Sequence, residues 1–258
     1  MTASTTKTRQ RIDYGIDAPG LVRTLFLVGT VALVLALVVG FSPWPGYPWG
    51  MVAAGVFGVV SVYALVLGTF MVYSSKVGKL RERDRLLDLI AWTGSEAVLD
   101  IGCGRGLMLI GAAKRLTTGK AVGIDVWRAE DQSANTPEAT IENARLAGVA
   151  DRIEVQTADM RSLGFGDSSF DVIVSHWVVH NVSEKQDRKV ALREMVRVLK
   201  PGGVIVLADI AHHDEYAAEL TACGLQDVRI VENGSRTKLA AALWFGLFRP
   251  AAVIGRKR

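Results

Sequence analysis

Residues 98–106 have the sequence VLDIGCGRG, an apolar run that passes directly into three alternate glycines. The run suits a buried strand, and Gly102, Gly104 and Gly106 suit a tight turn into a helix, because glycine adopts positive φ freely. In a doubly wound α/β sheet such a turn lies at the edge where the parallel strands end and ligands bind. The spacing departs from a dinucleotide fingerprint, which disfavours a nicotinamide cofactor. A purely structural turn remains the alternative.

The chain around this turn alternates apolar runs with amphipathic segments, after a charged, helix-like segment at 79–92. Runs rich in Val and Ile, apolar on both faces, are typical of parallel strands buried between helices. The pattern predicts a doubly wound α/β sheet. Its predicted strands are Ala97–Ile101, Ala121–Asp125, Arg152–Thr157, Phe170–Ser175 and Val204–Asp209.

Helix boundaries fall between these strands. Thr136, followed by proline, predicts a helix start, and Gly148 its end. Ser183 with Gln186 predicts a capping box for a later helix that ends before Pro201. The buried face of that helix is predicted at Leu192, Met195, Val196 and Leu199.

Acidic residues follow the second and third strands. Asp125 ends the second strand, where a carboxylate can accept hydrogen bonds from both hydroxyls of a ribose. Asp159 follows the third strand and could bond an adenine amino group. A helix cap or a solvated turn is the alternative for Asp125. Together with the glycine turn, these acids predict a nucleoside site across three successive strand ends.

Five segments carry a resemblance to the class I S-adenosylmethionine-dependent methyltransferases, across essentially all of residues 79–258. The resemblance implies a Rossmann-like, mostly parallel seven-stranded sheet, S-adenosylmethionine as cofactor, and two final antiparallel strands at Asp227–Glu232 and Ala251–Arg256. The matching segments are VLDIGCGRG (98–106), GIDVW (123–127), ADM (158–160), FDVIVSHWVVHNV (170–182) and LKPGG (199–203).

The same resemblance implies a role for individual residues. The backbone of the three glycines would run past the methionine part of the cofactor, and Asp100 would hold its amino group. Asp125 would hold the ribose, and Asp159 with Met160 the adenine. Trp127 would flank the adenine ring, or else pack under the loop as a core aromatic. The implied cofactor-binding residues are Asp100, Gly102, Gly104, Gly106, Asp125, Val126, Trp127, Asp159, Met160 and Ser175.

Methyl transfer from a sulfonium is an in-line displacement that demands alignment of the acceptor in a dry site. It needs neither a metal nor an oxyanion hole, and a general base only for a protonated acceptor. His176 and His180 are the candidate bases after the fourth strand. His212 and His213 either line the acceptor site or belong to a polar loop. No metal site is predicted, because no third ligand has suitable spacing.

A long uncharged stretch precedes this domain, with no charged residue between Arg23 and Lys76. Leu21–Phe41 and Met51–Tyr73 are each long enough to cross a bilayer as a helix, and a Pro- and Trp-rich turn separates them. A cleaved signal peptide is the alternative for the first segment. Gly55, Gly58 and Ser61 either form a close-packing face or reflect the general frequency of Gly in spans.

Basic residues flank both ends of this stretch, whereas the turn is uncharged. The arrangement predicts a multi-pass protein of the cell (inner) membrane with both termini and the catalytic domain in the cytoplasm. Two distant cysteines in the chain fit a reducing compartment. The predicted organisation is a tail at 1–20, two transmembrane helices at 21–73 and a methyltransferase domain at 74–258.

Two further segments leave alternatives open. The polar loop 128–135 either covers the cofactor or is a solvated connection. The apolar segment Leu239–Phe248 either caps the sheet or touches lipid.

The sequence predicts a membrane-anchored methyltransferase of a small or lipid-like acceptor. Alternatives are a tethered methyltransferase of a soluble metabolite and a non-catalytic S-adenosylmethionine-binding sensor. We expect no nucleic-acid partner, because the net charge of +4 comes with basic residues beside the spans, and Ser175-His176-Trp177 follows the fourth strand instead of Asn/Asp-Pro-Pro.

Overall fold

The computed structural model describes residues 11–42, 48–128, 130–232, 242–243 and 249–258. These residues fall into two compact units. The sheet unit holds residues 11–14, 80–127 and the described part of 135–258. The hairpin unit holds residues 15–42, 48–79, 128 and 130–134.

Two predictions fall on residues that are not described. The apolar segment Leu239–Phe248 lies outside the described residues apart from 242–243, and so does most of the Pro- and Trp-rich turn.

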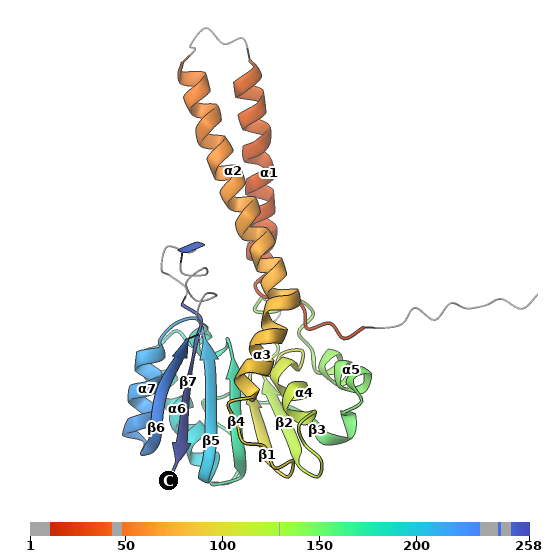
Figure 1. Ribbon diagram of the computed structural model, residues 1–258, viewed down its shortest axis with the longest axis vertical. Helices are drawn as coiled ribbons and strands as arrows, with labels where there is room; N and C mark the ends of the chain where they lie inside the picture. Colours follow the sequence, from red (N-terminus) through yellow and green to blue (C-terminus); the bar gives the residue numbers. More distant parts are fainter. Residues whose placement is uncertain (1–10, 43–47, 129, 233–241, 244–248) are drawn as a thin grey trace, which may run out of the picture. The chain divides into compact units, whose positions relative to one another are not determined.

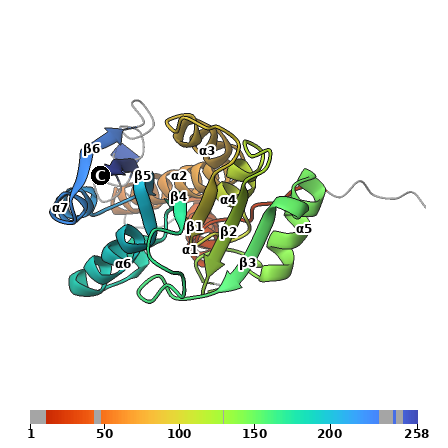
Figure 2. The same ribbon diagram turned by 90° about the horizontal axis from the view of Figure 1, so that it is seen from below.

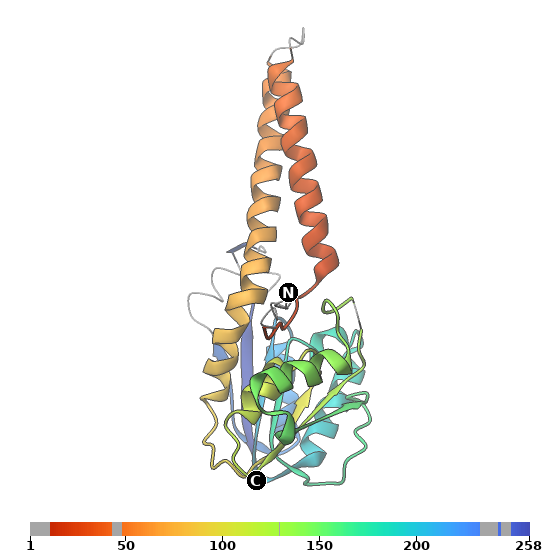
Figure 3. The same cartoon turned by 90° about the vertical axis from the view of Figure 1, so that its right-hand side faces the viewer.

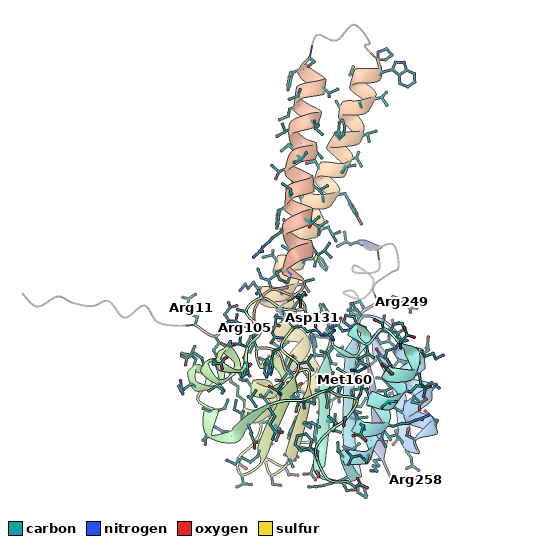
Figure 4. The ribbon with its side chains drawn as sticks, turned by 180° about the vertical axis from the view of Figure 1, so that it is seen from behind. Arg11, Arg105, Asp131, Met160, Arg249 and Arg258 are labelled. Carbon is teal, nitrogen blue, oxygen red and sulfur yellow. The ribbon has the colours of Figure 1, made fainter. Side chains whose placement is uncertain are left out.

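The hairpin unit is built on two apolar helices, α1 (Pro19–Phe41) and α2 (Trp49–Tyr73), which lie side by side (Figures 1 and 3). Both are long and apolar enough to cross a membrane. Most of their large side chains are exposed, and Figure 4 shows these side chains to be almost entirely carbon. The predicted spans fall within these two helices.

Small residues bring α1 and α2 into contact. Ser61 Oγ donates a 2.8 Å hydrogen bond to the carbonyl of Gly29, and a Cβ on Gly29 would lie 2.7 Å from the Leu65 side chain. Gly55 and Gly58 would have no atom within 4 Å of an added Cβ. Only Ser61 of the three predicted contact residues therefore lies in the interface.

The reason is the spacing of the contact face. Ala54 lies against Gly40, Ser61 against Gly29, and Gly68 against the Phe26 ring. These positions on α2 are seven residues apart, about two helical turns, and the two other glycines lie off this line.

The sheet unit contains seven strands in the order β3-β2-β1-β4-β5-β7-β6 (Figure 1). Neighbouring strands are parallel except that β7 runs antiparallel to both β5 and β6. This confirms the predicted mostly parallel, Rossmann-like sheet with two final antiparallel strands. The strands are β1 (Ala97–Ile101), β2 (Lys120–Asp125), β3 (Ile153–Thr157), β4 (Phe170–His176), β5 (Leu199–Asp209), β6 (Leu225–Glu232) and β7 (Ala251–Lys257).

Helices cover both faces of the sheet (Figure 2). One core cluster packs Leu86 and Met108 against Val98 and Val174, and the other packs Leu192 against Leu99 on the opposite face. The first face carries α3 (Lys79–Leu87), α4 (Leu107–Ala113) and α5 (Pro137–Ala147), and the second carries α6 (Lys185–Val198) and α7 (His213–Ala222). The predicted buried face of α6 is confirmed at Leu192, Met195 and Val196, whereas Leu199, also buried, lies past the end of α6 and begins β5.

The two predicted helix starts have different outcomes. Thr136 Oγ1 accepts the N–H of Ala139 at 3.2 Å, and Gly148 ends α5 with φ 71°, as predicted. The capping box at Ser183 is wrong, because α6 begins at Lys185 with no side-chain cap. The buried Arg188 side chain bonds the carbonyls of Val182 and Ser183 and so fixes this segment instead.

Two further local predictions need correction. β5 begins at Leu199, so the Pro-Gly-Gly segment expected between helix and strand belongs to the strand. His213 does not lie in the predicted polar loop, because it is the first residue of α7 and its Nε2 lies 2.9 Å from the carbonyl oxygen of Asp209, whereas His212 precedes the helix. That contact holds the helix start against the end of β5.

Candidate active site

The glycine turn follows β1 and opens α4. Gly102, Gly104 and Gly106 have φ of 68°, 50° and 85°, in the left-handed region that favours glycine. A Cβ on Gly102 would lie 2.2 Å from Val178, so the segment after β4 approaches the turn closely. Both the backbone angle and the space require glycine at position 102.

Two polar residues of α5 hold the carbonyls of this turn. Thr140 Oγ1 donates to the carbonyl of Gly104 at 2.6 Å, and Asn143 Nδ2 donates to the carbonyl of Arg105 at 3.0 Å. Both side chains are buried. Neither residue was predicted from the sequence, although their i, i+3 spacing on the inward face of α5 was an available signal.

Asp100 lies beneath the turn and is 1% exposed. Its Oδ2 accepts the N–H of Leu109 at 2.8 Å, whereas its Oδ1 has no hydrogen-bond partner among the described residues. Burial raises the pKa of Asp100 to about 8, the Leu109 N–H opposes the shift, and the charge of Asp125 adds to it. A buried carboxylate oxygen without a donor suits a cationic ligand group.

Asp125 ends β2 and connects three parts of the site. Its Oδ2 accepts the N–H of Gly104 at 2.8 Å, and its Oδ1 accepts the N–H of Trp127 at 2.7 Å and Asn135 Nδ2 at 3.4 Å. A carboxylate offers about four acceptor sites, so these three donors leave capacity for a ligand hydroxyl. Asn135 entered the sequence analysis only as part of a polar loop.

Trp127 and Val126 follow Asp125. Trp127 has a φ of 59°, and its indole Nε1 donates to Thr157 Oγ1 at 2.8 Å, at the end of β3. The ring is partly buried against the core, while Val126 is 48% exposed. The indole is thus fixed between the ends of β2 and β3.

Asp159 and Met160 follow β3. The Asp159 carboxylate is engaged by Arg161, whose Nη2 donates to it at 2.6 Å, and Arg161 also reaches Asp187 at 2.9 Å. A ligand amino group at Asp159 would therefore share the carboxylate with Arg161. Met160 is partly buried against the core.

Ser175 is buried and bridges two strands. Its Oγ donates to the carbonyl of Ile101 at 2.9 Å, which links β4 to the end of β1. Ser175, predicted to bind the cofactor, thus makes a hydrogen bond that joins two neighbouring strands at the site.

The two candidate bases have different surroundings. His180 Nδ1 lies 2.5 Å from Asp209 Oδ1, and the N–H of His180 donates to Asp209 Oδ2 at 3.0 Å. His176 instead stacks on Trp177, with ring centroids 5.1 Å apart. The Asp209 carboxylate therefore orients the imidazole of His180.

Asp209 ends β5 and is 1% exposed. Besides His180 it accepts the hydroxyl of Tyr216 at 3.0 Å and the N–H of Ile210 at 2.8 Å. Burial and the charge of Asp209 raise the pKa of Tyr216, so the phenol stays a donor. Asp209 was predicted only as the last residue of a strand, with no role in the site; its position at a strand end was the available signal.

Within the described residues, no group of three or more His, Cys, Asp or Glu side chains is placed to hold a metal ion. Cys103 and Cys223 are both free, and Cys103 is buried in the glycine turn.

Comparison with known proteins gives a consistent result. Residues 99–207 match the family described as "Methyltransferase domain". The chain is similar to methyltransferase GfsG of Streptomyces halstedii, with 33% identity over 130 residues, 50% of this chain and 43% of that protein. It is also similar to 27-O-demethylrifamycin SV methyltransferase of Amycolatopsis mediterranei, with 33% identity over 132 residues, 50% of this chain and 44% of that protein.

The chain thus spans less than half the length of these curated relatives. Among solved structures, a SAM dependent methyltransferase from Aquifex aeolicus has a TM-score of 0.54 at 21% identity, covering 70% of this chain and 92% of that one. At this identity the likeness shows the fold.

Proposed function

We propose that this chain, which belongs to the class I S-adenosylmethionine-dependent methyltransferase family, methylates a small acceptor that partitions into a membrane. The family match confirms the predicted family and its cofactor. The small-molecule acceptor is supported by the similar Amycolatopsis protein, whose name gives such an acceptor.

One observation carries the proposal: two buried carboxylates converge on the glycine turn. Asp100 leaves one oxygen without a donor beneath the turn, and Asp125 is bonded to the turn at Gly104. A cationic amino group suits Asp100, and ribose hydroxyls suit Asp125. The residues present therefore fit S-adenosylmethionine, and Trp127 would flank its adenine ring.

When bound, the cofactor supplies a methyl group on a positively charged sulfur. The main task of the chain is then to align the acceptor, since the displacement neutralises charge and needs no oxyanion hole. Val178 lies against Gly102, which brings the segment after β4 to the methionine end of the site. That segment also carries His180.

We assign the base to His180 because Asp209 fixes its tautomer. A carboxylate accepts, so Nδ1 of His180 carries the proton that faces Asp209, and Nε2 keeps a lone pair. Nε2 can then take the proton of an acceptor hydroxyl as the acceptor oxygen attacks. His176, stacked on Trp177, would form part of the wall of the site.

The hairpin supports a membrane location. A core helix of a soluble protein is mostly buried, whereas α1 and α2 expose most of their apolar side chains. Basic residues on both flanks favour a cytoplasmic location for both termini and for the domain. An anchored enzyme meets acceptors that dissolve in the bilayer at a high local concentration, which favours a lipid-like acceptor.

The test uses the full chain in nanodiscs with methyl-labelled S-adenosylmethionine, first with a cell lipid extract and then with soluble metabolites. We expect label in the organic phase, and less label with Asp125→Ala at cofactor concentrations that do not saturate the variant. Label found only in the aqueous phase would contradict a lipid-like acceptor and would support a soluble one. Cofactor binding without transfer to either fraction would make the protein a sensor and contradict the proposal.

A further inference from the structure

A buried ion pair lies in the hairpin unit, outside the site. Lys79 Nζ is 3.0 Å from Asp17 Oδ1, and the Lys79 side chain is 2% exposed. The ammonium also donates to the carbonyl of Gly15 at 3.2 Å, and Ser75 Oγ donates to Asp17 Oδ2 at 3.2 Å. Asp17 precedes α1, and Lys79 follows α2 and the π-helical turn η1 (Ser74–Gly78). The pair therefore ties the chain before the first helix to the chain after the second.

The loop after β2 is paired with the same segment before α1. The N–H of Ile16 donates to Ser133 Oγ at 2.9 Å, and the N–H of Ser133 donates to the carbonyl of Ile16 at 3.1 Å. The N–H of Ala18 donates to the carbonyl of Asp131 at 3.0 Å. Two stretches more than a hundred residues apart in sequence are thus held together by backbone groups.

The loop also reaches the ion pair. Gln132 Nε2 donates to Asp17 Oδ1 at 3.3 Å, the same oxygen that Lys79 holds. Because a buried charge that loses its partner is strongly disfavoured, Lys79 keeps Asp17 in place, and Asp17 in turn offers a fixed acceptor to the loop.

This loop is joined along the chain to residues that direct the ribose carboxylate. Asn135, two residues after Ser133, donates through Nδ2 to Asp125, and the N–H of Trp127 on the other side of the loop donates to the same carboxylate. The loop and two of the donors that orient Asp125 are therefore neighbours along the chain.

We propose that the Asp17–Lys79 pair is a positioning element of the cofactor site, which holds residues 131–133 and thereby keeps Asp125 oriented for the ribose. The inference rests on the proposed function, since it takes Asp125 as the ribose ligand. A loop ordered in advance loses less conformational freedom when the cofactor binds, so the pairing raises cofactor affinity. Residues before α1 thus contribute to binding without touching the cofactor.

The test uses the full chain in nanodiscs and the double variant Gln132→Ala/Ser133→Ala, which removes the side-chain contacts of the loop and leaves Lys79, Asp17 and Asp125 unchanged. We expect the Kd for S-adenosylmethionine to rise about three- to tenfold, the loss expected for one or two hydrogen bonds. Amide exchange at residues 130–135 should accelerate, whereas kcat at saturating cofactor should stay the same.

Two further variants sharpen the result. Lys79→Met should produce the same rise in Kd and the same faster exchange, because it frees Asp17. Glu142→Gln is the matched control, since it breaks an exposed ion pair with Arg145 on α5 and should change neither quantity.

The outcomes separate the two proposals. A wild-type protein that binds cofactor, together with a double variant of unchanged Kd and unchanged exchange, would overturn this inference alone. A wild-type protein that binds no cofactor would contradict the proposed function, while exchange at 130–135 would still report whether the pairing holds the loop.

Discussion

The backbone N–H of Gly104 donates a 2.8 Å hydrogen bond to Asp125, which joins the turn after β1 to the carboxylate at the end of β2. Trp127 donates a second backbone bond to the same carboxylate. The direction of the Asp125 carboxylate is therefore set by the main chain of two neighbouring strand ends. A ligand that bonds Asp125 meets an acceptor that is already oriented.

Replacement of Asp125 tests this arrangement. We expect Asp125→Ala to raise the Kd for S-adenosylmethionine more than about tenfold, because the charge-assisted hydrogen bonding of the carboxylate to the ribose is lost. Isothermal titration calorimetry of the full chain in detergent measures the change. An unchanged Kd would remove Asp125 from the site, and a melting temperature close to that of the wild type would exclude unfolding as the cause.

Asp100 predicts a pH dependence of cofactor binding. Its raised pKa of about 8 means that the free protein carries a neutral Asp100 at pH 7. A bound ammonium group favours the carboxylate, so binding should release a proton. Affinity should then rise from about pH 6 to about pH 7.5, by at most roughly tenfold per pH unit.

Calorimetry in two buffers of different ionisation enthalpy counts the released protons. Asp100→Asn keeps the shape of the side chain and removes its titration, so its affinity should be weaker and flat over this range. A wild-type affinity that is independent of pH would contradict the assignment of Asp100 to the amino group.

His180 predicts a loss of rate without a loss of cofactor binding. We expect His180→Ala to lower kcat by about 10² to 10⁴, the contribution usual for a general base, while the Kd for S-adenosylmethionine stays the same. Label transfer to the active acceptor fraction measures the rate. Asp209→Asn should also lower kcat, because it no longer fixes the tautomer of His180. Full activity of His180→Ala would contradict the assignment of His180 as the general base.

The hairpin predicts which sides of the membrane its flanks face. A cysteine in place of Ser42, at the end of α1, should react with an impermeant maleimide on intact cells. A cysteine in place of Ser95, an exposed residue before β1, should react only after permeabilisation. Cys223 and Cys103 should stay unlabelled in intact cells, and the opposite pattern would overturn the orientation.

The centre of the sheet could be predicted because β1 and β4 are buried on both faces and because the turn after β1 requires glycine. The run from Val98 to Ile101 is fully or almost fully buried, and Gly102 tolerates no side chain against Val178. Such constraints act within a few residues of the chain, so the sequence displays them directly. The position of Asp125 at the edge of the sheet could be predicted for the same reason, since this residue ends a recognisable strand.

Long-range polar contacts could not be predicted in this way. Asn143 bonds the carbonyls of Arg105 and Asp13, and Asp209 accepts hydrogen bonds from His180 and from Tyr216 on α7. A polar residue on a helix or at a strand end resembles a solvated position until its partner is known. The capping box at Ser183 was wrong for a related reason, because the contact made in that segment is Arg188 donating to the carbonyls of Val182 and Ser183, which a local cap pattern does not reveal.

Titration of the full chain with S-adenosylmethionine tests the central claim most directly. We predict saturable binding at one cofactor per chain, with release of a proton at pH 7 and with affinity weakened in both Asp100→Asn and Asp125→Ala. Absence of binding by the folded wild-type protein, or binding that both variants leave unchanged, would contradict the site described at the ends of β1 and β2.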